Sequence, residues 1–289
     1  MTKEHALHVQ GVWFVGIAFL VALSSLVLPR LSEHTEQVVL VLLILLLGVP
    51  HGALDAAFAQ RFYNVKGVMG WIAFSILYIL LSSVVVGIWM VAPLLYLIFF
   101  LTISLAHFAG DPIEGTKTLS RFLYGGAILV LPTLFHANEV SRLFGFLVGT
   151  SAARIALSGL SFLAIPWLVG LVVAVLYEIL KNKQKLTGFE YIAVGLLALT
   201  TPPLVAFTVF FCAMHSVRHV LRTVIWMGKK PHQVLYKCLL PMVTLCIIAF
   251  TAWELLSGKN FDNKIIQITF VGLAALTVPH MIILGKRPT

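Results

Sequence analysis

The sequence predicts an all-α membrane protein, a polytopic bundle of transmembrane helices, and three observations support this fold class. Of the 289 residues, 60 % are hydrophobic and only 11 % are charged, whereas a soluble domain is about 25 % charged. Apolar runs close to the length that crosses a bilayer recur from one end of the chain to the other. No polar linker separates these runs into groups. We therefore expect a single integral membrane domain over residues 1–289.

Hydrophobic length and helix-breaking residues divide the chain into ten apolar runs, from which we expect about eight to ten spans. The runs are 11–29, 37–60, 69–91, 93–109, 119–136, 159–181, 189–201, 203–227, 235–256 and 265–285. The seventh run is short, and Pro202 and Pro203 separate it from the eighth. The segment 137–158 has mixed polarity, which is typical of a helix that lies in the membrane interface.

The positive charge of the chain predicts its orientation. The net charge is +9. If alternate loops lie on opposite sides, 14 of the 20 Lys and Arg residues fall on the side of the N-terminus, and Arg218 lies inside a span. The five on the other side are Arg30, Arg142, Arg154, Lys259 and Lys264. Because cytoplasmic loops carry the excess of Lys and Arg, we expect both termini in the cytoplasm and a multi-pass protein of the inner (cytoplasmic) membrane.

Composition also argues against other classes of protein. The basic residues form no stripe with interleaved aromatic residues, and no zinc-finger spacing occurs, so we expect no nucleic-acid partner. The three cysteines form no Cys-x-x-Cys pair, so the sequence suggests neither a disulfide framework nor a thiolate metal site.

Histidine is the residue type that points to a site. Six of the ten histidines fall within or at the end of predicted spans: His51, His107, His136, His215, His219 and His280. Ionisable groups inside a membrane are costly and usually mark a functional site. All but His136 lie in the later part of spans that run in the same direction, so we expect five imidazoles in the cytoplasmic half of the bilayer. His136 is expected towards the opposite face.

The spacing of these histidines favours a metal site. His215 and His219 are four residues apart, which places both rings on one helix face, one turn apart. Such a pair can bind one metal ion through two ring nitrogens. A lone intramembrane histidine more often makes a hydrogen bond between helices, but further histidines at the same depth favour the metal. Imidazole suits iron, zinc, copper or nickel, so the ligand type does not select among them.

Two acidic residues have the same spacing from a histidine. Asp55 follows His51 by four residues, and Asp111 follows His107 by four. Each carboxylate could orient its histidine by accepting the second ring N–H, or could bind the metal itself. We expect Arg218, which lies between His215 and His219, to pair with one of these two carboxylates.

Four blocks of the sequence resemble a known family. The segments 49–55 (VPHGALD), 106–111 (AHFAGD), 215–219 (HSVRH) and 277–281 (TVPHM) are similar to blocks of the Brp/Blh family. These bacteriorhodopsin-related membrane proteins act as β-carotene 15,15′-dioxygenases. The resemblance covers about residues 40–284, and the order and spacing of several histidine blocks make it specific.

The resemblance implies a non-haem Fe(II) oxygenase that splits the central 15,15′ double bond of β-carotene with O₂ to give two molecules of all-trans-retinal. It implies that the iron ligands, and so the catalytic centre, are His51, His107, His215 and His219. Residues expected to support these ligands are Asp55, Asp111, His280 and His136. The expected substrates are β-carotene and O₂, the surroundings are membrane lipid, and a retinal-binding rhodopsin is a plausible functional partner.

Two other functions fit parts of the pattern. A proton- or metal-coupled transporter would also use intramembrane His and Asp residues, but it would spread them over the whole depth of the membrane and would often contain inverted repeats. A membrane metalloprotease would need His-Glu-x-x-His, and this chain has Ser216 where that Glu would stand. The clustering in one half of the bilayer favours the oxygenase.

Overall fold

The computed structural model describes residues 3–30, 32–48, 52, 54–228, 254, 258 and 260–285, and within these residues the regular elements are all helical. They are α1 (Lys3–Val27), α2 (Glu33–Leu43), η1 (Ile44–Gly48), α3 (Asp55–Phe62), α4 (Gly67–Val91), α5 (Pro93–Phe108), α6 (Thr118–Val130), η3 (Leu131–Leu134), α7 (Ala137–Val148), α8 (Thr150–Leu176), η4 (Tyr177–Lys181), α9 (Lys185–Thr200), α10 (Pro203–Val209), η5 (Phe210–Ser216), α11 (Val217–Met227) and α14 (Phe261–Leu284). The all-α prediction is confirmed.

Length and composition identify the segments that can cross a membrane. Among the described residues five qualify: Glu4–Val27, Gly67–Val91, Thr150–Lys181, Pro203–Met227 and Phe261–Leu284. A sixth results if Thr118–Leu134 and Ala137–Val148, which are bent by 108°, form one broken span. The predicted runs 93–109 and 189–201 correspond to the 16-residue helices α5 and α9. The run 235–256 lies outside the described residues except for Glu254.

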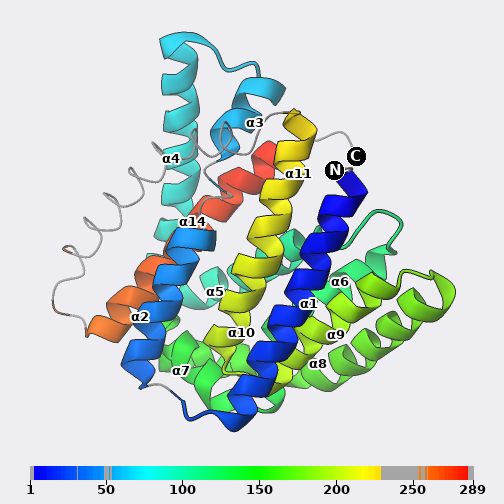
Figure 1. Cartoon of the computed structure of the whole chain (residues 1–289). Helices are drawn as coiled ribbons and strands as arrows, with labels where there is room; N and C mark the ends of the chain where they lie inside the picture. The colour runs from blue at the N-terminus through cyan, green and yellow to red at the C-terminus, as the bar shows by residue number, and fades with distance from the viewer. Residues whose placement is uncertain are drawn as a thin grey trace.

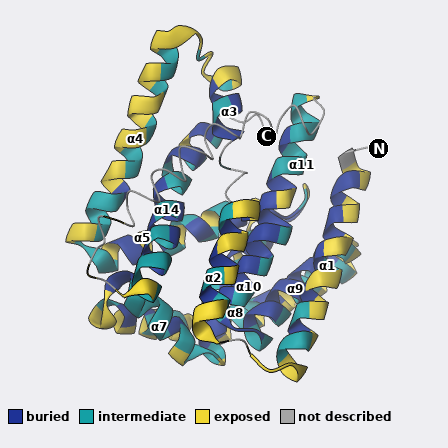
Figure 2. Cartoon of the chain, turned by 60° about the vertical axis from the view of Figure 1, so that its left-hand side comes forward, coloured by how far each residue is buried: buried dark blue, intermediate teal, exposed yellow. Residues whose placement is uncertain are grey.

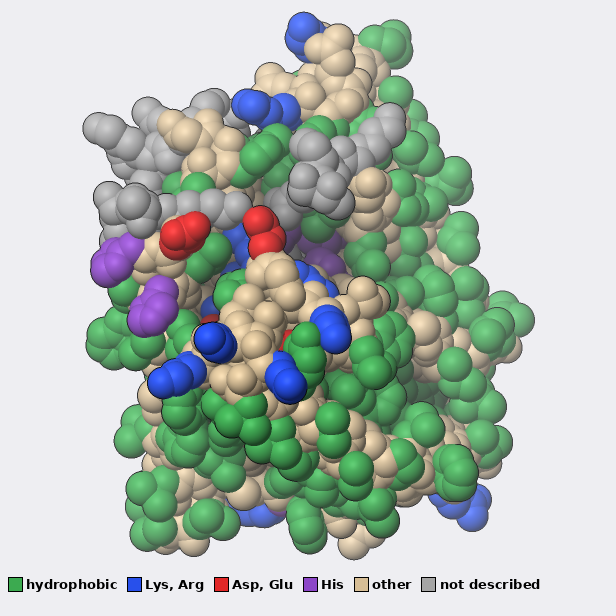
Figure 3. Space-filling model, turned by 90° about the vertical axis from the view of Figure 1, so that its right-hand side faces the viewer, with side chains coloured by type: hydrophobic (Ala, Val, Ile, Leu, Met, Phe, Trp, Pro, Cys, Tyr) green, Lys and Arg blue, Asp and Glu red, His purple; other side chains and the backbone are tan. Residues whose placement is uncertain are grey.

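The surface is that of a membrane protein. Helix α4 is apolar along its length and exposes large side chains such as Met69, Ile76 and Met90, which suits contact with lipid. Figure 2 shows exposed residues along the outer faces of the helices and buried residues where the helices meet. On the face drawn in Figure 3, hydrophobic side chains cover much of the lower part and the right-hand side, and several Lys and Arg side chains gather near the middle of the face.

Helix packing places the long helices side by side (Figure 1). Helix α1 packs mainly on α9, α14 packs on α4, and α6 and α7 both pack on α8. The largest buried cluster lies among α1, α6, α9 and η5, and it includes Phe14, Tyr124, Tyr191 and Phe210. The first residues of α1 and the last residues of α14 lie at the same upper end of Figure 1.

Helices α5 and α6 pack closely at Gly125. A Cβ atom on Gly125 would lie 2.6 Å from both the Ala109 nitrogen and the Leu105 oxygen, which are rigid backbone atoms at the end of α5. We expect Gly125→Ala to lower the free energy of unfolding by about 1–3 kcal/mol, because it forces apart two closely packed helices. Denaturant titration in detergent checks this. Gly159→Ala on α8 is the control, since its Cβ meets nothing within 4 Å, and it should not destabilise the protein.

Candidate metal centre

Four histidine rings converge where α5, η5, α11 and α14 meet. His107 Nε2 and His215 Nε2 are 3.0 Å apart. The His280 ring centroid lies 5.1 Å from that of His107 and 5.1 Å from that of His219. His215, His219 and His280 are all buried. Three of the four rings were predicted as ligands, and the structure brings them together from separate helices; the fourth predicted ligand, His51, lies outside the described residues.

Helix geometry around His215 fixes its ring. His215 lies in η5, a π-helical segment between the α-helices α10 and α11, and such π turns are frequent at functional sites. The Phe211 ring stacks on His215 at 5.7 Å with an interplanar angle of 16°, and the edge of Phe108 packs on it at 4.9 Å. The next residue, Ser216, donates its hydroxyl to the carbonyl of Gly48 at 3.1 Å, which ties η5 to η1.

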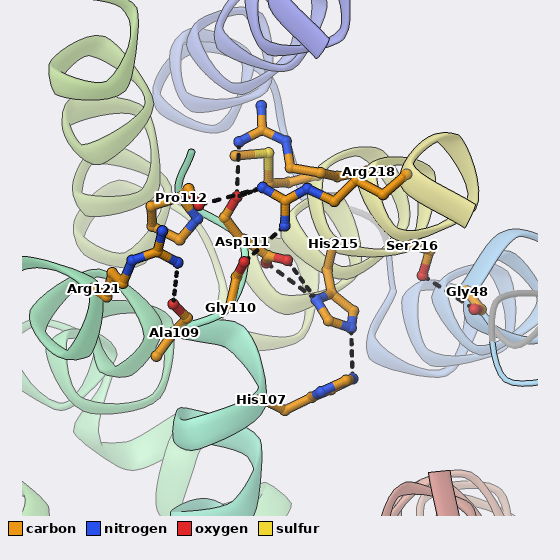
Figure 4. A network of polar contacts seen from close by, with 12 residues as sticks. Gly48, His107, Ala109, Gly110, Asp111, Pro112, Arg121, His215, Ser216 and Arg218 are labelled. Atoms are coloured by element: carbon orange, nitrogen blue, oxygen red, sulfur yellow. Dashed lines mark hydrogen bonds and ion pairs between the residues drawn. The ribbon is translucent and has the colours of Figure 1, made fainter. Parts of the chain in front are cut away.

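Two buried carboxylates hold two of these rings. His215 Nδ1 lies 3.0 and 3.1 Å from the two carboxylate oxygens of Asp111, and Figure 4 shows this contact. His280 Nδ1 lies 2.5 Å from Asp55 Oδ1. A carboxylate accepts the proton of a neutral imidazole at Nδ1, which leaves a lone pair on Nε2. Metal-binding histidines are commonly prepared in this way.

The partners of the carboxylates differ from the predicted ones. The sequence pairs Asp111 with His107 on one helix face, but α5 ends at Phe108 and a turn carries Asp111 onto the next loop. Its carboxylate therefore contacts His215 instead. Asp55 lies in the first turn of α3, where its described contacts are with His280 and Tyr78. The expected pairing of Asp55 with His51 lies outside the described residues.

The other two predicted supporting residues lie in different surroundings. His280 belongs to the cluster and contacts two of its rings. His136 stands at the start of α7, 3.7 Å from Glu139. Glu139 in turn pairs with Arg30, at 2.7 Å. These contacts place His136 outside the histidine cluster; its expected position towards the opposite face of the membrane stays a prediction.

Two ring nitrogens of the cluster are spaced as they would be on one metal ion. Two nitrogen ligands at right angles, each about 2.1 Å from one metal, would lie about 3.0 Å apart, which is the separation of the His107 and His215 Nε2 atoms. Within the described part of the chain, no three His, Cys, Asp or Glu side chains are grouped closely enough to hold a metal together. Metal binding by this cluster stays a prediction, and so does the role of His51, which lies outside the described residues.

A small apolar cavity adjoins the histidines. It measures about 40 Å³. The residues that line it are Gly52, Phe100, Ser104, His107, Phe108, Phe207, Phe211, Leu273, Leu276, Thr277 and His280. His107 and His280 thus face a mostly aromatic and aliphatic space, which is the usual composition of a site for an apolar small molecule.

A buried ion pair lies directly behind Asp111. Arg218 is fully buried, and its guanidinium donates to both carboxylate oxygens of Glu190, at 2.5 and 3.0 Å. It also donates to the Gln10 side chain at 2.8 Å. The expected pairing of Arg218 with the Asp55 or Asp111 carboxylate is therefore wrong, because α9 brings Glu190 to this position. Glu190 was overlooked, although opposite charges inside two apolar runs indicate a pair.

Tyr78 on α4 is a second residue that the sequence did not single out. Its hydroxyl donates to Asp55 Oδ2 at 3.0 Å, so it holds the carboxylate that contacts His280. No motif marks it, because the contact joins three separate helices.

We expect Tyr78→Phe to weaken metal binding by about 10-fold, because a carboxylate loses one donor and holds the His280 ring less firmly. Metal affinity measured by chelator competition checks this. Tyr63→Phe is the control, since that hydroxyl donates to the Ile282 carbonyl. Equal affinities for Tyr78→Phe and the parent protein would contradict the role of Tyr78.

Comparisons with known proteins identify the family of the chain. Residues 42–286 match the family model described as beta-carotene 15,15′-dioxygenase. A curated protein of that name from uncultured marine bacterium 66A03 is 32 % identical over 261 residues, which cover 84 % of this chain and 90 % of that protein. No solved structure matches. The chain belongs to the β-carotene 15,15′-dioxygenase family.

Proposed function

We propose that this protein cleaves the central 15,15′ double bond of β-carotene with O₂ to give two molecules of all-trans-retinal. The proposal places an Fe(II) ion at His51, His107, His215 and His219. The observation that carries it is the pair of buried histidines, His215 and His280, each held by a carboxylate beside an apolar cavity. Family membership supplies the substrate.

Bound iron would supply the redox chemistry that activates O₂. The chain's own task is to hold neutral imidazoles with their Nε2 lone pairs facing inward, and Asp111 performs it for His215. His280 stands in the same relation to Asp55, so it supports the neighbouring rings or replaces one of the four ligands. Rings fixed by neighbouring side chains keep the metal geometry constant while a bulky substrate binds.

The cavity suits a hydrocarbon that is dissolved in the bilayer. Phe207 and Phe211 stack on one another at 5.4 Å, and Phe108 packs against both, so the walls next to His107 are aromatic and apolar. A space of about 40 Å³ holds a molecule the size of O₂ or water but not a C40 polyene. Substrate entry therefore requires these rings to move, and we propose that β-carotene enters sideways from the lipid.

The same proposal includes a location. The chain would lie in the inner membrane with both termini in the cytoplasm, as the unequal distribution of Lys and Arg among the loops suggests. Retinal is itself an apolar, lipid-soluble molecule, so it would leave through the bilayer. A retinal-binding rhodopsin in the same membrane is the expected acceptor.

Expression in a β-carotene-producing bacterium tests the proposal. We expect cells to lose their orange colour and accumulate retinal, as measured by chromatography, in proportion to the amount of protein. His107→Ala is the negative control, because it removes the Nε2 atom that faces His215. Unchanged carotenoid in cells that contain the folded protein and iron would refute this function.

A further inference from the structure

The loop after α5 has its backbone held by arginine side chains. Arg222 donates to the carbonyl oxygens of Gly110 at 2.7 Å, Asp111 at 2.7 Å and Pro112 at 3.3 Å. Arg218 donates to the Asp111 carbonyl at 3.2 Å. Arg121 donates to three more carbonyls, those of Ala109, Ile113 and Thr116. Five successive carbonyls, 109–113, thus accept from a guanidinium. Figure 4 labels the first four of these residues.

This arrangement supplies hydrogen-bond donors that the end of the helix lacks. Carbonyl groups in an irregular turn at the end of a helix have no helical partner and need one where water is scarce. An arginine presents several donors in a rigid fork, so one side chain can satisfy several neighbouring carbonyls at once. The turn is therefore fixed in position, and so is the Asp111 carboxylate that it carries.

One helix face contacts both the backbone and the side chain of Asp111. His215, Arg218 and Arg222 follow one another at intervals of three and four residues, which places them along one side of η5 and α11. His215 contacts the Asp111 carboxylate, while the two arginines contact the Asp111 carbonyl. A change in the arginine contacts would therefore turn the carboxylate relative to the ring of His215.

Arg222 and Arg218 differ in their other partners. Arg218 is anchored by Glu190 and Gln10, so its removal would also leave a buried carboxylate without its ion partner. The hydrogen bonds described for Arg222 go to backbone carbonyls of the loop alone. Arg222 is thus the residue whose replacement tests the loop with least disturbance elsewhere.

We propose that Arg222 is a positioning residue of the metal centre, which acts through Asp111 to orient His215. The inference rests on the proposed function, because it takes His215 as a metal ligand. It is distinct from a purely structural role, in which Arg222 would join the loop to α11 and leave the metal-binding geometry unchanged.

Cobalt(II) titration of the metal-free protein in detergent separates the two roles. The affinity is measured by chelator competition, the visible spectrum of the bound cobalt reports its coordination, and thermal unfolding of the metal-free protein reports stability. We expect Arg222→Met to weaken cobalt binding about 10-fold or more and to change the spectrum, and Asp111→Asn to weaken it about 10–100-fold. Arg222→Lys, whose single ammonium cannot reach all three carbonyls, should fall between Arg222→Met and the parent protein.

The double variant Arg222→Met/Asp111→Asn tests whether Arg222 acts through Asp111. If Arg222 acts through Asp111, the double variant binds cobalt no more weakly than Asp111→Asn alone. Arg30→Met serves as the control, because Arg30 pairs with Glu139 outside the histidine cluster, and it should leave cobalt binding unchanged.

Three outcomes would overturn the inference. Parent-like cobalt affinity and spectrum in Arg222→Met, with only a lower unfolding temperature, would show a structural role. Losses that multiply in the double variant would show that Arg222 does not act through Asp111. A parent protein that binds neither cobalt nor iron would refute the metal centre itself, and that result is separate from the other two.

Discussion

Replacing His215 with alanine is expected to remove the metal and the activity together. Its ring is the common neighbour of His107 Nε2 and the Asp111 carboxylate, at 3.0 Å from each. In the proposed iron site the variant would lose one ligand, and it would leave a buried carboxylate without its imidazole partner. Since even residues that only support a ligand change affinity or activity by 10–100-fold, we expect loss of a ligand to cost more than about 100-fold in both. Iron content by elemental analysis and retinal formation are the measurements.

His34→Ala is the matched control for this variant. His34 also has its Nδ1 at 3.1 Å from an aspartate, Asp262, but this pair is exposed and involves none of the four clustered rings. It should retain iron and activity. If His215→Ala retained both as well, the metal centre would lie elsewhere in the chain.

Glu190→Gln is expected to have the largest effect on stability. The carboxylate and the Arg218 guanidinium are both about 1 % exposed and only 2.5 Å apart. Gln keeps the shape of Glu but leaves the arginine charge buried without a counter-charge, and breaking such a pair costs about 3–5 kcal/mol. The measurement is the free energy of unfolding in mixed micelles. The same reasoning predicts a similar loss for Arg218→Met.

The double variant Arg218→Met/Glu190→Gln should be more stable than either single variant, because it leaves no unpaired charge. Glu33→Gln is the control, since Glu33 pairs with Arg142 on the surface, where the Glu33 side chain is 66 % exposed. We expect it to change stability by about 1 kcal/mol or less. Losses in the double variant equal to the sum of both single losses would contradict the ion-pair explanation.

Residues on continuous helices could be placed from sequence. The spacing of His215 and His219 and the matching depth of His107 were sufficient to predict that these three rings meet. Each residue of a helix adds a fixed rise, so the position of a histidine along a membrane span gives its depth in the bilayer. The helical class followed from the same apolar runs.

The contacts between helices could not be predicted in this way. Asp111 leaves the face of His107 because α5 stops at Phe108, and the apolar run shows no sign of this stop. Asp55 reaches His280, which lies 225 residues further along the chain, only because α3 and α14 pack together. Arg218 pairs with Glu190 rather than with an aspartate because helix packing brings α9 to it. Spacing along a helix determines which side chains share a face, but it does not determine which helix faces them.

The π-helical segment η5 means that the chain has one residue more between α10 and α11 than a continuous α-helix would need. The widened turn absorbs that residue locally, so the helices on either side present their side chains in nearly the directions of an unbroken α-helix. Phe207 and Phe211 line the cavity on one side of the turn, while His215, near the end of η5, and His219, on α11, belong to the histidine cluster. Helices bend most easily at such turns, so η5 is the point at which the aromatic wall can shift relative to His219 while both flanking helices stay folded.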